Sequence, residues 1–351
     1  MTAYRFCRTD DMALLAEALD RCWRHDFPAD PPVTPAAFKR AIRDLQVWCS
    51  SCMVAFSGSE PIGVLIGAKR PSATLVHRIA VHPDHRRQGH GRHLLGSLAS
   101  KLAILGPPRI VAEVPETLAP ARGLFRASGY VEEALLTDYV WRDEDAGGPE
   151  VAGITGSQDD RFVIPVTVDD LAANGLLAEA ASPVCWERAI ETLVARKDEI
   201  AGIGVASGER IEACLLYAPA GAEPPQHGER RAASAPPDRS EPRRGPFGSA
   251  ADRSGGTSSQ LHAGRAAAVA EAAVPPAARA AEILALRSFV ENGGARLGLL
   301  IDHLGRLGLG TLRLPKVHPA EFSSGFLEAL GFRPSGRHVL YAATARADRQ
   351  G

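Results

Sequence analysis

The sequence predicts an α+β fold that occurs twice in one chain. The chain has 351 residues, and because a domain usually holds about 100–200 residues, this length favours two domains. Up to about residue 143, short apolar runs of strand length alternate with leucine-rich segments of helical periodicity. A similar order of strands and helices returns after residue 161, which predicts an internal repeat.

The first half has the elements of one complete domain. Asp10 and Asp11 precede an apolar segment with helical spacing, and acidic residues in this place favour a helix start. Gly129 is a typical C-cap residue of a later helix. A glycine and a proline within residues 57–61 predict a hairpin between two apolar strands. The expected strands are residues 4–7, 51–56, 62–68, 73–81, 109–113 and 131–141. The expected helices are residues 12–23, 36–45, 91–105 and 119–127.

The second half is expected to repeat this order after a linker. Residues 144–160 are acidic and rich in small side chains, so they separate a first domain, residues 1–143, from a second, residues 161–351. An insertion at residues 219–279 has few large apolar side chains, and we predict that it is a disordered, solvated spacer. Its slight excess of arginine is weak support for nucleic-acid binding. The expected strands include residues 162–166, 203–206, 211–217, 311–315 and 337–343, and the expected helices include residues 186–196, 298–309 and 322–332.

The composition is that of a soluble globular protein, with 45% hydrophobic and 23% charged residues. The formal net charge is −1, so no global field attracts the chain to nucleic acid or to a membrane. There is no apolar run of about 18 residues and no apolar core of a signal peptide. The six cysteines are too sparse for a disulfide scaffold, which favours the cytoplasm. Cys49 and Cys52 form a C-x-x-C motif without a second pair, so we expect no metal.

A glycine-rich turn at residues 86–91 lies between an apolar strand and a leucine-periodic helix. Glycines let the backbone bend sharply, and the free amides of a helix's first turn bind anions such as phosphate. Arg86 and Arg87 add positive charge to this turn. A Gly-x-Gly pattern alone is weak, but between a strand and a helix it predicts a phosphate-binding site.

The same residues resemble the signature of the GNAT superfamily of acetyl-CoA-dependent N-acetyltransferases. That signature is Arg/Gln-x-x-Gly-x-Gly/Ala, and Arg86, Gly89 and Gly91 match its fixed positions. The segments IAVHPDHRRQGHGRHLL and ARGLFRASGY are also similar to family segments, so the resemblance covers about residues 3–142. It implies a mixed, mostly antiparallel sheet flanked by helices. It also implies direct transfer of an acetyl group from acetyl-CoA to a primary amine of a small molecule or peptide.

The resemblance further implies a set of residues that bind acetyl-CoA. The backbone of one strand would bind the pantetheine arm, and the amides of the glycine turn would surround the pyrophosphate. The strand residues are Ile79, Ala80 and Val81, and the turn residues are Arg86, Arg87, Gln88, Gly89, His90 and Gly91.

Two residues are candidates for the general base that removes a proton from the acceptor amine. His77 lies two residues before Ile79, and LVHRIAVH is similar to a strand of arylalkylamine N-acetyltransferases in which a histidine faces the amine. An imidazole with a pKa of about 6.5 suits this role. Glu113, at the end of the next strand, is the alternative and could act through a water. His77 could equally be a packed strand residue and Glu113 a solvated acid, while His82 and His85 are expected to be exposed.

Phe125 departs from the family pattern. Many members have a tyrosine at this place that protonates the leaving thiolate, and phenylalanine cannot donate a proton. The second half departs further, because aligning its leucines with the first half places Glu291 at Arg86 and Arg296 at Gly91. A carboxylate and a side chain with a Cβ there oppose phosphate binding.

The sequence therefore predicts an acyltransferase with a working first domain and a degenerate second copy. Its partners would be acetyl-CoA and an amine acceptor, without nucleic acid or membrane. The chain would be a monomer with an internal pseudo-dimer, or a homodimer. The alternative is a non-catalytic acyl-CoA-binding protein with a regulatory or interaction role.

Overall fold

The structure is a computed structural model of the chain. It describes residues 1–145, 163–177, 183–219 and 280–345, apart from residues 29, 31, 209 and 292. The predicted linker and the predicted spacer lie outside the described residues, except at their first positions. The domain limits at residues 143 and 161 therefore stay a prediction.

The predicted elements of the first half are present. Thr34 begins one helix by accepting a hydrogen bond from the amide of Ala37 (3.1 Å), and Gly129 follows another helix with a φ of +83°. The strands are β1 (Thr2–Phe6), β2 (Met53–Ser57), β3 (Glu60–Lys69), β4 (Thr74–Val81), β5 (Arg109–Pro115) and β6 (Val131–Arg142). The helices are α1 (Met12–Trp23), α2 (Pro35–Leu45), α3 (His90–Leu105) and α4 (Ala119–Ala127).

The second half repeats this order, with one correction. The helix expected at residues 186–196 is wrong, because the extended backbone of Ala189 divides it into a 3-10 turn, Trp186–Arg188, and a short helix, α6. The strands are β7 (Val163–Pro165), β8 (Ala201–Ser207), β9 (Arg210–Pro219), β10 (Ala280–Ser288), β11 (Thr311–Val317) and β12 (Arg333–Thr344). The helices are α5 (Val168–Ala173), α6 (Ile190–Ala195), α7 (Gly293–Arg306) and α8 (Ser324–Ala329).

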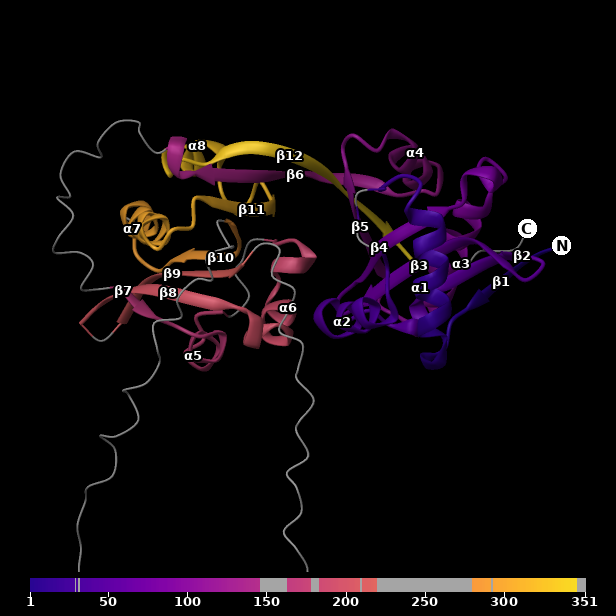
Figure 1. Cartoon of the computed structure of the whole chain (residues 1–351), viewed down its shortest axis with the longest axis horizontal. Helices are drawn as coiled ribbons and strands as arrows, with labels where there is room; N and C mark the ends of the chain where they lie inside the picture. Colours follow the sequence, from indigo (N-terminus) through magenta and orange to yellow (C-terminus); the bar gives the residue numbers. More distant parts are fainter. Residues whose placement is uncertain are drawn as a thin grey trace, which may run out of the picture. The chain divides into compact units, whose positions relative to one another are not determined.

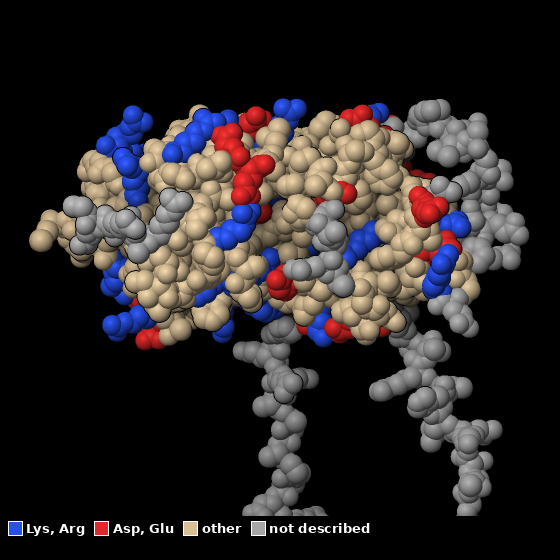
Figure 2. Space-filling view, turned by 180° about the vertical axis from the view of Figure 1, so that it is seen from behind, with Lys and Arg blue, Asp and Glu red and all other residues tan. Residues whose placement is uncertain are grey.

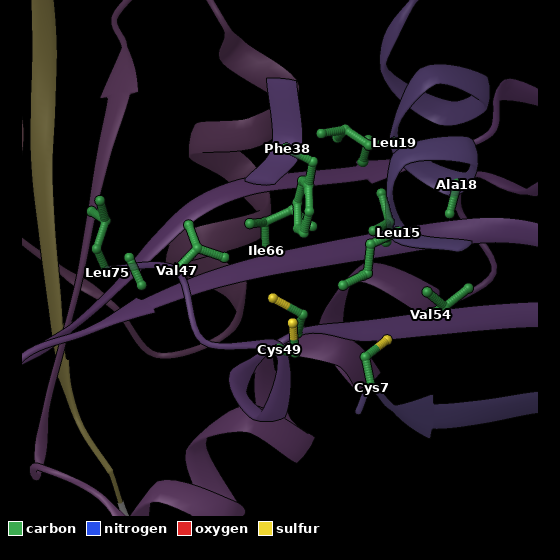
Figure 3. Packing of buried hydrophobic residues seen from close by; sticks show 14 of the residues in the cluster. Cys7, Leu15, Ala18, Leu19, Phe38, Val47, Cys49, Val54, Ile66 and Leu75 are labelled. Carbon is green, nitrogen blue, oxygen red and sulfur yellow. The ribbon is translucent and has the colours of Figure 1, made fainter. Parts of the chain in front are cut away.

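Helices cover both faces of the first-half sheet. Side chains alternate between the faces of a strand, so Ile66 of β3 packs with α1 and α2 while Leu65 packs with α3 and α4. Figure 3 shows the first of these clusters, in which Leu15 of α1 and Phe38 of α2 lie over Ile66. The result is a layered α+β domain, as predicted.

The last strands of the two halves are exchanged. The described strands form one 12-stranded sheet in the order β1-β2-β3-β4-β5-β12-β6-β11-β10-β9-β8-β7. β12 therefore lies between β5 and β6 of the first half, and β6 lies between β12 and β11 (Figure 1). In the register of this exchange, Leu340 pairs with Glu113 of β5 and Val339 pairs with Leu135 of β6. The sequence predicted two copies of the fold, but it did not predict that they share a sheet.

β12 supplies core side chains to both faces of the first half. Val339 and Tyr341 are buried in the cluster beneath α3 and α4. Ala342 is buried on the α1 and α2 side, and Leu340 packs against that cluster. The second half therefore completes the core of the first.

Two properties are relevant to binding nucleic acid or a membrane: the distribution of surface charge and the length and apolar character of the helices. On the described part of the face drawn in Figure 2, basic and acidic side chains are interspersed rather than gathered by sign. None of the helices in the described ranges combines the length and apolar character needed to cross a membrane.

Candidate active site

β4 is bulged at His77 and separates from β5 beyond its first residues. Ile66 of β3 pairs with Arg78, whereas Gly67 pairs with Val76, so His77 has no partner of its own in β3. The parallel pairing of β4 with β5 is confined to two residue pairs, at Thr74 and Leu75. The following part of β4 is therefore bonded to β3 along one edge and unpaired with β5 along the other, which leaves backbone groups for a ligand.

The predicted pantetheine-binding residues lie on this part of β4. Ile79, Ala80 and Val81 pair with β3, so their other edge is directed away from β3. Ala80 is buried, while Ile79 and Val81 are half-buried. The structure thus brings them to the opening between the two strands.

The glycine turn follows β4 and leads into α3. Gly89 is the N-cap residue of α3 with a φ of +88°, and no side chain caps the helix there. The amide of His93 bonds back to the carbonyl oxygen of Gly89 (3.0 Å), so the preceding amides of the first turn lack intrahelical acceptors. A Cβ on Gly89 would point into open space, and one on Gly91 would lie 3.0 Å from Leu124 of α4. This cradle fits the phosphates of a nucleotide.

The two arginines of the turn have different surroundings. Arg86 forms an ion pair with Asp26 (2.8 Å), and its Nε donates to the carbonyl oxygen of Val81 (2.8 Å). Arg86 therefore anchors the turn to β4, and its predicted part in binding acetyl-CoA stays a prediction. Arg87 is exposed with a φ of +65°, and Gln88 is exposed beside it.

Several histidine rings lie close together at the turn, a grouping that the sequence did not predict. His90 is buried, and its Nδ1 lies 2.6 Å from the hydroxyl oxygen of Tyr4. His82 and His85 are half-buried rather than exposed, and the His82 ring packs edge-on against His25 at 4.9 Å. Burial lowers the pKa of His82 and of His90. Within the described residues, no group of histidine, cysteine or carboxylate side chains is arranged to hold a metal ion.

His77 is half-buried at the bulge. Its pKa is lowered to about 4, mainly by burial; Glu187 opposes this decrease, and Arg78 and Lys316 add to it. The imidazole is therefore neutral at pH 7, so a lone pair is available to accept a proton.

The stability of the protein should depend on the titration of His77. The folded state keeps the imidazole neutral down to about pH 4, whereas the unfolded chain protonates it at about pH 6.5. The unfolded state binds more protons in this window, so the free energy of unfolding should fall by up to roughly 3 kcal/mol as the pH decreases through it. Urea unfolding at pH 7 and pH 4.5 measures this loss, and His77→Gln should lose less. An equal loss in both proteins would contradict the assignment.

Glu113 is a buried, paired carboxylate rather than a solvated acid. Its side chain is 7% exposed. Oε1 accepts a hydrogen bond from the amide of Trp186 (3.0 Å), and Oε2 accepts one from Nζ of Lys316 (2.9 Å). Burial raises its pKa, and Glu187 adds to this rise while Lys316 opposes it. Both of the bonded partners come from the second half.

Phe125 is the buried residue of α4 and lies in the core of the first half. Its ring packs edge-on against Tyr130 at 5.1 Å and stacks on Tyr341 of β12 at 5.6 Å. The hydroxyl of Tyr341 donates to Oε1 of Glu132 (2.8 Å). Position 125 thus holds a buried ring without a hydroxyl, and its correspondence to the family's tyrosine stays a prediction.

The corresponding region of the second half has a different chemistry. β10 is also bulged, at Leu284 between Ile283 and Ala285, so its bulged residue is aliphatic whereas that of β4 is His77. Arg296 of α7 pairs with Glu212 (2.8 Å), and Glu291 is exposed. The features that suit a nucleotide in the first half are therefore replaced here.

Comparisons with known proteins identify a family match and similar folds. Residues 12–130 match the model of the Acetyltransferase (GNAT) family. A tandem GNAT protein from the clavulanic acid biosynthesis pathway superposes with a TM-score of 0.53 at 16% identity, covering 99% of both chains. A GCN5-related N-acetyltransferase from Sphaerobacter thermophilus gives 0.54 at 14% identity, covering 98% of this chain and 96% of that one.

A third structure has a similar fold at lower identity. The GCN5-related N-acetyltransferase from Anabaena variabilis superposes with a TM-score of 0.53 at 9% identity, covering 99% of this chain and 73% of that one. At these identities the superpositions establish the fold alone. Residues 12–130 therefore match the GNAT family of acetyltransferases, and the described part of the chain has a fold similar to that of a tandem GNAT protein.

Proposed function

We propose that the chain is an acetyl-CoA-dependent N-acetyltransferase that acts on a primary amine of a small molecule or peptide. The observation that carries this proposal is the opening between β4 and β5, directly followed by the uncapped, glycine-bounded start of α3. A strand edge without a partner suits the amide groups of a pantetheine arm, and free helix amides suit a pyrophosphate.

Different residues of the first half bind acetyl-CoA and accept the proton. When bound, acetyl-CoA supplies a thioester whose carbonyl carbon is open to attack. The amides of residues 86–91 hold its phosphates, and the free edge of residues 79–81 orients the arm. His77 accepts a proton from the acceptor's ammonium group, which frees the nitrogen lone pair. The C–N bond then forms as the C–S bond breaks, and the nitrogen loses its second proton to solvent to give the neutral amide. The thiolate takes a proton from solvent or from a group other than Phe125, which has none to donate.

An assay of thiol release from acetyl-CoA with a panel of amines tests the proposal. His77→Gln should lower kcat by about 100-fold with little change in acetyl-CoA affinity, because it removes the base and keeps the cradle. Gly89→Ala should weaken acetyl-CoA binding by about tenfold, since the φ of +88° at this residue is unfavourable for alanine.

Gly96→Ala is the matched control. It makes the same change within α3, where a Cβ also meets open space and φ is not positive. Equal affinities for acetyl-CoA in the two glycine variants would count against the cradle. Unchanged turnover in His77→Gln would exclude the histidine as the base.

A second function is favoured by Phe125. A protein that binds an acyl-CoA without turnover needs no group to protonate a thiolate, and the buried Phe125 ring provides none. Such a protein would serve a regulatory or interaction role. Binding of acetyl-CoA without turnover of any amine would support this non-catalytic function over the acetyltransferase.

A further inference from the structure

A cavity of about 450 Å³ lies between the two halves of the chain. Its first-half lining includes Arg70 and Val111, and its second-half lining includes Trp186 and Glu191. A cavity of this size holds a small organic molecule. Charged and apolar side chains both line it, so it suits a ligand with an apolar part and a charged group. Of the predicted site residues, Glu113 is the one that lines this cavity.

The cavity reaches the opening between β4 and β5 from the face that α1 and α2 cover. Ala73, Val111 and Leu340 line it and also pack in the core cluster of that face. Val111 pairs with β4 at the point where the two strands separate, and Glu113 lies two residues farther along β5. α3, which begins at the glycine turn, packs on the opposite face. An acceptor in the cavity and an acetyl-CoA arm from the turn would therefore meet at the opening from opposite faces.

Arg70 brings a buried guanidinium group to this cavity. Its side chain is 6% exposed, and arginine stays protonated at any physiological pH. Nε donates to Oε1 of Gln46 (3.0 Å), and Nη2 donates to the carbonyl oxygen of Trp186 (3.1 Å) and to Oγ1 of Thr192 (2.6 Å). The guanidinium carbon also lies over the Trp186 ring, 3.9 Å from its centroid. These contacts from both halves fix the orientation of the group.

The remaining nitrogen of Arg70, Nη1, has no hydrogen-bond acceptor among the described residues. Its ion-pair partner is Glu191, whose Oε2 lies 3.6 Å away, beyond hydrogen-bonding distance. The Glu191 side chain is 41% exposed and lines the same cavity. The two N–H groups of Nη1 are therefore available to a ligand, and a buried donor favours one that supplies an acceptor.

The charges of the lining favour a ligand with a single negative charge. Arg70 attracts an anion, whereas Arg109, which also lines the cavity, already donates to both oxygens of Glu133. Glu113 and Glu191 repel a doubly charged group, such as a phosphate monoester, more than a singly charged one. A carboxylate has one charge, and its two oxygens match the N–H groups of a guanidinium. The cavity thus suits a carboxylate better than a phosphate.

We propose that this cavity binds the acceptor, and that Arg70 selects an amine that also carries a carboxylate. Nη1 donates to the carboxylate, while the amine extends to the opening between β4 and β5. This role rests on the proposed acetyltransferase function and names its substrate class. Trp186 joins the two ends, because its amide donates to Glu113 and its carbonyl oxygen accepts from Arg70. With one residue between these two side chains, we expect only a few carbon atoms between the acceptor's amine and carboxylate.

Matched pairs of amines test this specificity. Glycine, β-alanine and γ-aminobutyrate each have a neutral carboxamide of the same shape: glycinamide, β-alaninamide and γ-aminobutyramide. In the thiol-release assay with acetyl-CoA, the best of the three carboxylates should give a kcat/KM about tenfold or more above that of its carboxamide, because the carboxamide lacks the charge-assisted hydrogen bond. Carboxamides that react as well as their carboxylates throughout the series would overturn the proposal.

Glu191→Gln tests the proposal by a gain of affinity, which a damaged fold would not produce. Glu191 lies 3.6 Å from Nη1, so it competes with a bound carboxylate. Removal of its charge should raise the affinity for the carboxylates by about threefold and leave that for the carboxamides unchanged. Glu199→Gln is the matched control, because Glu199 also accepts a hydrogen bond from a first-half arginine, Arg43 (2.6 Å), but does not line the cavity. It should keep the wild-type affinities.

Arg70→Gln should abolish the preference for carboxylates and keep the affinity for acetyl-CoA. The substitution removes Nη1 and leaves the glycine turn unchanged. A preference for carboxylates that persists in this variant would overturn the assignment to Arg70. If Arg70→Gln does not fold, Glu191→Gln decides, and carboxylate affinities there that match those of Glu199→Gln would overturn the proposal.

Binding without turnover separates this proposal from the proposed function. If the wild-type chain acetylates no amine, the acetyltransferase function fails. Ligand-observed NMR titrations with the same pairs then measure the dissociation constants directly. Tighter binding of the carboxylates, lost in Arg70→Gln, would support the cavity as a carboxylate site, whereas equal dissociation constants within each pair would overturn it.

Discussion

A chain that ends after residue 143 should fail to form the native first half. It would retain β1 to β6 but lack β12, which lies between β5 and β6 in the sheet. It would also lose Val339 and Tyr341 from the core beneath α3 and α4. Loss of a large buried aromatic ring alone costs about 3–5 kcal/mol, which is a large part of the stability of a typical domain. We expect no cooperative urea transition and no binding of acetyl-CoA.

The matched experiment restores the missing strand from a second polypeptide. Residues 161–351, added to residues 1–143, should recover the cooperative transition and the binding of acetyl-CoA, because β12 is then available again. The same second fragment without residues 333–351 should recover neither. A first fragment that folds and binds acetyl-CoA alone would show that β5 and β6 can pair directly, which would contradict the prediction.

Lys316→Met should destabilise the protein by about 3–5 kcal/mol at pH 7. The substitution keeps most of the side chain's length but leaves the buried carboxylate of Glu113 and the half-buried carboxylate of Glu187 without their cation, and breaking a buried ion pair in this way is costly. The loss in free energy of unfolding relative to the wild type should become smaller as the pH falls from 7 to 4, because the unpaired carboxylates can then take up protons. Urea unfolding of both proteins at several pH values measures it.

Lys197→Met is the control for this variant. Lys197 pairs with Asp169 at 2.7 Å, but both side chains are exposed, and such pairs contribute little to stability. It should change the free energy of unfolding by less than about 1 kcal/mol. Similar losses in the two variants would show that the cluster around Lys316 behaves like a surface ion pair.

The sequence predicts most of the helices and strands, but it does not predict which strands pair with one another. Helical leucine spacing and Gly129 locate α3 and the end of α4, because these signals are local. The exchange of β6 and β12 leaves no local signal, since an alternating strand has the same pattern whichever neighbours it pairs with. The helix expected at residues 186–196 fails for a related reason, because an extended Ala189 within an apolar stretch is a tertiary effect.

The sequence also predicts only those residues of the candidate site that have a local signal. Gly89 and Gly91 reveal the glycine turn, because their small size is needed within a single strand-turn-helix unit. His77 is suggested by its place on a strand, but the bulge that singles it out depends on pairing with β3. Lys316 and Glu187 could not be predicted, since each is an ordinary charged residue until the two halves come together. The pairing of Arg86 with Asp26 likewise joins segments that are distant in the chain.

The exchange of β6 and β12 limits how the second copy can change during evolution. Under the proposed function, the turn before α7 is no part of the first copy's site, so mutations there can accumulate. β12 has no such freedom, because Tyr341 and Val339 lie in the first copy's core. Selection for the activity of the first copy therefore also acts on the final strand of the second. The two copies can lose symmetry in their binding sites, but neither can be deleted as a redundant duplicate.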